Sequence, residues 1–167
     1  MSEINFQKIL IDGAIYSLIA SIFLLVTMRI NPRLFLQDYP KDVQNKVPPK
    51  STSEKQLSTI LGIGFLLILI IGPFLSTLTL KNANLEPLPF WVLLINSFGV
   101  AFFFNVVDWL MLDWLLFCTI QPKFMIIPGS EGMPGYKNYW MHFRGFLIGS
   151  LISLIGGLII TALVFFI

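Results

Sequence analysis

The chain has 167 residues, a formal net charge of +2 and a mean hydropathy of +0.81. Only 12% of its residues are charged, half of the about 25% that is usual in soluble globular domains. This composition excludes an ordinary soluble domain, and the small net charge argues against nucleic acid as a partner. A single cysteine, Cys118, excludes an internal disulfide and a Cys-x-x-Cys pair.

Four apolar stretches are long enough to cross the ~30 Å core of a bilayer as helices. They span residues 9–30, 57–80, 90–119 and 143–167. Helices are expected because open strands would leave backbone groups unpaired in lipid. The sequence therefore predicts one all-α transmembrane domain over residues 1–167, a four-transmembrane-helix bundle. The start of the chain lacks the basic segment of a signal peptide, so we expect the first stretch to remain as a helix.

The first connection, residues 31–56, is a basic loop that we expect in the cytoplasm, against anionic lipid headgroups or a cytoplasmic partner. Asn31-Pro32 ends the first helix, and Ser51 and Glu54 have the spacing of a capping box that would start the second. Gly72-Pro73 lies inside the second stretch and predicts a kink. The carbonyl freed by the proline would then be satisfied by Ser76 or by another helix.

The third stretch is too long for a straight span, since thirty residues of helix measure roughly 45 Å. Beyond Trp109 we expect it either to continue into the cytoplasm or to bend along the interface. The connection over residues 120–141 is rich in glycine and proline and carries the apolar run 124–127. It predicts a cytoplasmic interfacial loop, either a plain connector or a lid over a polar site.

Basic residues predict the orientation of the chain. Nine of the eleven lysines and arginines lie in or beside the first and third connections, and only Lys8 and Lys81 lie on the other side. The positive-inside rule therefore places those two connections in the cytoplasm. A multi-pass protein with both termini extracytoplasmic is the expected topology.

One polar cluster at the cytoplasmic membrane edge is the candidate ligand-binding site. Asn105, Asp108 and Asp113 fall within an arc of about 140° at 100° per residue, and His142 and Arg144 enter the fourth stretch. Ionisable groups at membrane depth are costly and often functional. The alternative is a structural ion pair in which Arg144 binds Asp108 or Asp113 and ties the third helix to the fourth.

The sequence predicts neither a metal nor a cofactor. A metal site of Asp108, Asp113 and His142 would have one histidine and no Glu-x-x-His or His-x-x-x-His spacing. The glycines at 129, 132 and 135 do not have the spacing or context of a phosphate-binding loop.

Small residues recur every four positions in the fourth stretch, at Gly145, Gly149, Ser153 and Gly157. This spacing predicts a close helix contact. The contact would be with another helix of the same chain or with a second copy, so a homo-oligomer or a membrane partner stays open beside the lipid bilayer itself.

Three classes of function follow. The first is a small membrane protein that binds a polar or amphiphilic ligand, or an ion, at its cytoplasmic edge. The second is a non-catalytic assembly or scaffold subunit. The third, an enzyme acting on a lipid-linked substrate with the two acids as general acid and base, has the least support, because the chain carries no complete catalytic motif. The sequence thus favours a protein that is not an enzyme.

Overall fold

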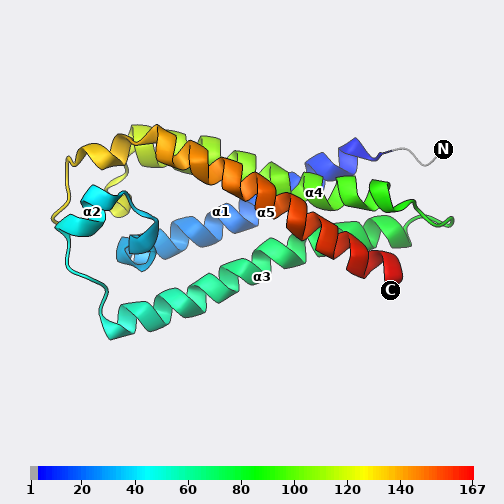
Figure 1. Ribbon diagram of the computed structural model, residues 1–167, viewed down its shortest axis with the longest axis horizontal. Helices are drawn as coiled ribbons and strands as arrows, with labels where there is room; N and C mark the ends of the chain where they lie inside the picture. The colour runs from blue at the N-terminus through cyan, green and yellow to red at the C-terminus, as the bar shows by residue number, and fades with distance from the viewer. Residues whose placement is uncertain (1–3) are drawn as a thin grey trace.

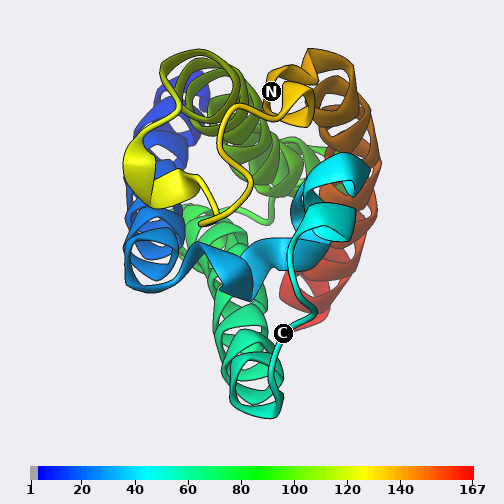
Figure 2. The same cartoon turned by 90° about the vertical axis from the view of Figure 1, so that its left-hand side faces the viewer.

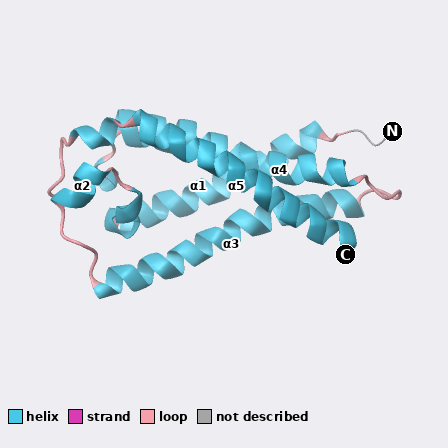
Figure 3. Cartoon of the chain, viewed as in Figure 1, coloured by secondary structure: helices cyan, strands magenta, loops and turns pink. Residues whose placement is uncertain are grey.

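The computed structural model describes residues 4–167, which form four long helices joined by short helices and loops (Figures 1 and 3). All four are long and apolar enough to cross a membrane, and residues 4–167 contain no strand. The predicted all-α four-transmembrane-helix bundle is therefore confirmed. The elements are α1 (Phe6–Ile30), η1 (Pro32–Asp38), α2 (Lys41–Lys46), α3 (Thr52–Asn82), α4 (Phe90–Val107), η2 (Asp108–Ile120), η3 (Lys123–Met125), η4 (Pro134–Lys137) and α5 (Tyr139–Phe166).

Side-chain caps set where α3 and α5 begin. The Ser51 hydroxyl accepts from the Glu54 N–H at 3.2 Å, and the Glu54 carboxylate accepts from the Ser51 N–H at 2.8 Å. This is the predicted capping box, and it starts α3 five residues before the apolar run at residue 57. At α5 the Asn138 side chain alone accepts from the Met141 N–H at 3.0 Å, so α5 also begins before its apolar run.

The proline in α3 is accommodated by a contact with α1. Pro73 has no N–H to donate, which leaves the Leu69 carbonyl without its helical partner. The Tyr16 hydroxyl of α1 lies 3.5 Å from that carbonyl oxygen, a long hydrogen bond. Gly72 makes room for it, because a Cβ there would overlap the Tyr16 ring. The predicted satisfaction of this carbonyl by another helix is thus confirmed.

The third span continues past Trp109 without leaving the helical path, because α4 passes directly into η2. η2 is a π-helix, in which the N–H of each residue bonds the carbonyl five positions earlier. The Thr119 hydroxyl bonds the Trp114 carbonyl, and the Trp109 and Trp114 rings lie 4.9 Å apart. Residues five apart therefore share a face of η2.

α5 packs most extensively on α4, and the two lie side by side in Figure 1. Gly157 lies against the Phe98 backbone, and a Cβ at Gly149 would overlap the Asn105 side chain. Ser153 is partly buried. Gly145 departs from the predicted stripe, because it is exposed and no atom lies within 4 Å of where its Cβ would be. The small residues of α5 thus serve a contact inside the chain.

The first and third connections fold together over one end of the bundle into a unit that we call the cap, residues 31–51 and 121–138 (Figure 2). Its core joins side chains of both connections to η2. The Tyr136 hydroxyl accepts from the Ile127 N–H at 3.0 Å and bonds Ser130 at 2.8 Å. Asp42 accepts from the Gly135 N–H at 2.9 Å, where a larger residue would overlap its carboxylate. The start of α1 and the end of α5 lie at the opposite end of the molecule (Figure 1).

Candidate functional site

A cavity of about 390 Å³ lies between α1, α3, η2 and the cap. Its apolar wall comes from α1, α3 and η2, with Phe35 and Met125 of the cap. Its polar groups come from η1, η2, α3 and α5. The polar lining residues are Gln37, Asp38, Tyr39, Ser58, Asp108, Asp113 and His142.

The centre of the polar wall is formed by Asp108, Asp113 and His142. The two aspartates are five residues apart, so the π-helical hydrogen bonding of η2 places both on the cavity face. His142 Nδ1 lies 2.9 Å from Asp113 Oδ1, and its ring packs against Phe117 at 5.0 Å. The His142 side chain is only 8% exposed.

Two atoms of this group keep hydrogen-bonding capacity. Nε2 of His142 is buried, and no partner for it exists among the residues that the structure describes. Asp108 likewise lacks a hydrogen bond or ion pair to any residue from 4 to 167. Its carboxylate therefore keeps its acceptor capacity for a ligand.

Asn105 and Arg144 do not join this group. The Asn105 amide donates to the Phe146 carbonyl and to the Ser150 hydroxyl, both at 3.0 Å, so it ties α4 to α5. Arg144 is exposed on α5, and Asp113 pairs with His142 in its place. The alternative of an ion pair between Arg144 and either Asp108 or Asp113 is not realised among residues 4–167, where Asp113 pairs with His142. Asn105 is absent from the cavity lining because its amide is turned to α5 and bonded there.

The cap closes the cavity with groups that the sequence did not single out. The Tyr39 hydroxyl donates to the Met125 carbonyl at 2.8 Å, which joins the first connection to the third. Asp38 brings a third carboxylate to the lining. Partial burial raises the pKa of Asp38, and the Lys50 ammonium and the Gln37 amide oppose that rise. Nothing in the local sequence marks Asp38, because its place depends on the packing of the two connections.

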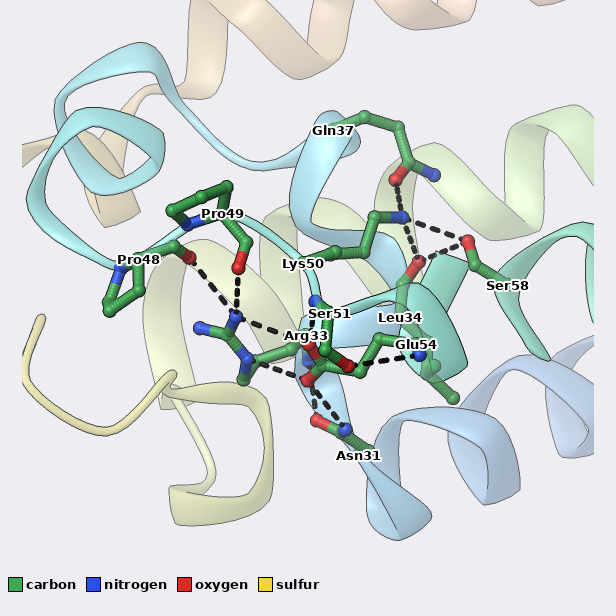
Figure 4. A network of polar contacts seen from close by, with 10 residues as sticks. All are labelled: Asn31, Arg33, Leu34, Gln37, Pro48, Pro49, Lys50, Ser51, Glu54 and Ser58. Atoms are coloured by element: carbon green, nitrogen blue, oxygen red, sulfur yellow. Dashed lines mark hydrogen bonds and ion pairs between the residues drawn. The ribbon is translucent and has the colours of Figure 1, made fainter. Parts of the chain in front are cut away.

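A second network fixes the cavity wall where η1 meets the start of α3 (Figure 4). Arg33 Nε donates to Glu54 Oε1 at 2.7 Å, and its Nη2 donates to the carbonyls of Pro48 and Pro49 at 3.0 and 3.1 Å. Lys50 Nζ donates to the Leu34 carbonyl and to Ser58, both at 2.9 Å. Two of the basic residues expected to face lipid headgroups are thus used inside the fold.

The donor set favours a cation over an anion. Of the described residues that line the cavity, three are aspartates and none is a lysine or an arginine. No group of three or more His, Cys, Asp and Glu side chains with the arrangement of a metal site occurs within residues 4–167. Protein-family models, curated proteins and solved structures were all compared with the chain, and none of them matches it.

Proposed function

We propose that this protein binds an amphiphile with a positively charged, hydrogen-bond-donating head group in the cavity beneath the cap. The observation that carries the proposal is the joining of three carboxylates to an apolar wall in one cavity of about 390 Å³. That volume lies within the usual range for small-molecule sites, roughly 300–1,000 Å³. No lysine or arginine occurs among its described lining residues, and the Lys50 ammonium acts on one of the three carboxylates, Asp38, from outside the lining.

Each side of the cavity has a distinct part in this proposal. Asp108 would accept the head group, because its carboxylate has no partner among the described side chains. Asp113 is held by His142 and would add charge at short range. Leu24, Phe65 and other apolar side chains of α1 and α3 would take the chain of the amphiphile.

We place this site at the cytoplasmic edge of the membrane. The support is the concentration of nine of the eleven lysines and arginines at the cap end of the chain. An assembly role through the small-residue stripe of α5 has less support, because Gly149 and Gly157 face α4.

The test is native mass spectrometry in mild detergent with two ligands of equal chain length, dodecylamine and dodecanol. The wild type should retain the amine in preference to the alcohol. Asp108→Asn should weaken amine binding by about tenfold, as expected for the loss of one charge-assisted hydrogen bond. Glu86→Gln is the matched control, because Glu86 is exposed and lies outside the cavity lining.

Two results would contradict the proposal. Equal retention of the amine and the alcohol would show that the carboxylates do not select the head group. Unchanged amine binding in both Asp108→Asn and Asp113→Asn would show that the amine does not bind in this cavity.

A further inference from the structure

A second hollow lies at the other end of the molecule, between α1 and α3. It has a volume of about 390 Å³, and its long wall is formed by Ile15, Ile19, Ile68, Ile71 and Leu75. Its charged side chains, Lys8 and Asp12, lie at its outer end with Ser76 and Thr79, and Tyr16, whose hydroxyl is held by the Leu69 carbonyl, lines it farther along. Lys8 and Ile19 are eleven residues apart in α1, which corresponds to about 16 Å along the helix. We call this hollow the outer groove.

Its polar end is an ion pair with fixed partners. Lys8 Nζ lies 2.7 Å from Asp12 Oδ2 and donates to the Thr79 hydroxyl at 3.0 Å. The Ser76 hydroxyl donates to the same oxygen of Asp12 at 2.6 Å. Ser76 is itself held by the buried amide of Asn96 at 3.0 Å. A chain of hydrogen bonds from α4 through α3 thus fixes the Asp12 carboxylate at the mouth of the groove.

The pair keeps one donor and one acceptor unused. Lys8 has three N–H bonds, and two of them are used by Asp12 and Thr79. Both hydrogen bonds to Asp12 reach Oδ2, so its Oδ1 has no partner among the described residues. The side chains of Lys8 and Asp12 are 22% and 26% exposed. A ligand at the mouth would meet one positive and one negative group side by side.

We propose that the outer groove binds one phospholipid with a zwitterionic head group that carries a primary amine, as in phosphatidylethanolamine. The phosphate would accept from Lys8, the ammonium would donate to Oδ1 of Asp12, and one acyl chain would lie along the isoleucines. This site is separate from the cavity under the cap, and the proposal does not depend on the function proposed for that cavity.

Charge complementarity and hydrogen bonding favour this lipid over phospholipids with other head groups. A head group with phosphate alone would satisfy Lys8 but would place a negative charge beside Asp12. A trimethylammonium head group has the right charges, but it has no N–H to donate to the carboxylate. Only a primary ammonium next to a phosphate matches both free positions of the ion pair.

The test is native mass spectrometry of the protein in an equimolar mixture of phosphatidylethanolamine, phosphatidylcholine and phosphatidylglycerol with identical acyl chains. The wild type should retain phosphatidylethanolamine in preference to both others. Asp12→Asn should reduce that preference by about tenfold, from the loss of a charge-assisted hydrogen bond. Glu86→Gln, which changes an exposed carboxylate outside the lining of the outer groove, should leave that preference unchanged.

A second pair of variants covers the case in which Asp12→Asn does not fold. Ile71 lines the groove and Ile70 does not, although both are exposed on α3. Ile71→Trp should fill the groove and displace the lipid, whereas Ile70→Trp should retain it. Equal retention of all three lipids would overturn the proposal. So would equal retention of phosphatidylethanolamine by the two tryptophan variants.

Discussion

Asp38 is the cavity carboxylate that the cap contributes, and its charge depends on pH. It lies at the end of η1 and lines the cavity from the cap side. Partial burial raises the pKa of this carboxyl, and the nearby Lys50 and Gln37 limit the rise. A raised pKa means that Asp38 loses its negative charge at a higher pH than an ordinary aspartate does.

This shift predicts the pH dependence of cation binding. Dodecylamine, whose ammonium group stays charged at and below neutral pH as that of lysine does, should bind more weakly as the pH is lowered from about 7. The loss should begin at a higher pH than for an ordinary aspartate with a pKa of about 3.9. The sign follows because protonated Asp38 no longer attracts the cation. Asp38→Asn should bind more weakly at neutral pH and lose less affinity on acidification. Affinities measured by isothermal titration calorimetry as the pH is lowered check the prediction.

Glu86→Gln, which changes an exposed carboxylate far from the lining, should keep the wild-type profile. If Asp38→Asn lost the same fraction of affinity as the wild type, Asp38 would not be the titrating group.

At the scale of the element, η2 shows where reading the sequence succeeded and where it failed. Asp108 and Asp113 stood out because charges are rare in apolar spans. The sequence also placed them within one arc of about 140°, from α-helical geometry. It could not predict the π-helical bonding that brings residues five apart onto one face, because that bonding is set by packing and not by composition. Trp109, Trp114 and Thr119, which are five residues apart, form one face of η2 that contacts α5 through Phe146 and Tyr139. Only those tertiary contacts distinguish the two forms of helix.

Local signals predicted helix ends better than they predicted contacts between loops. The capping box of α3 depends on residues three apart, so the sequence alone was enough to find it. The core of the cap joins Tyr39 to Met125 and Asp42 to Gly135, pairs that are 86 and 93 residues apart. No pattern within either connection indicates these partners. The binding groups of the cap therefore escaped prediction.

The packing of α4 on α5 supports a paired test of neighbouring glycines. A Cβ at Gly157 would lie 3.2 Å from the Phe98 backbone, whereas nothing lies within 4 Å at Gly156. Gly157→Val should therefore destabilise the fold by about 1–3 kcal/mol relative to Gly156→Val, as expected for overpacking. The two substitutions carry the same change in helix propensity. Thermal unfolding in detergent measures the difference, and equal stabilities would contradict the predicted α4–α5 contact.

At the scale of the whole molecule, the two hollows lie along one seam between α1 and α3. The outer groove extends to Ile19 and Ile68, and the cavity begins at Leu24 and Phe65. The rings of Phe23 and Phe65 stack between them at 5.8 Å. The cavity thus has three aspartates and the outer groove has one, Asp12, at opposite ends of the bundle. The composition predicted four spans, but it could not predict that α1 and α3 would form both sites.

The orientation of the bundle decides which leaflet each site faces. Labelling of introduced cysteines can test this orientation without removing the native Cys118. Cys118 is 1% exposed, so a membrane-impermeant maleimide should not reach it. Asn45→Cys lies on the exposed face of α2 in the cap, and Leu85→Cys lies in the exposed turn between α3 and α4. Neither substitution changes a charge, so the distribution of basic residues that favours a cytoplasmic cap is preserved. In intact cells the reagent should label Leu85→Cys at once, and Asn45→Cys only after the membrane is permeabilised. The reverse pattern would place the cap outside, where the carboxylates under it would meet ligands from the extracytoplasmic leaflet.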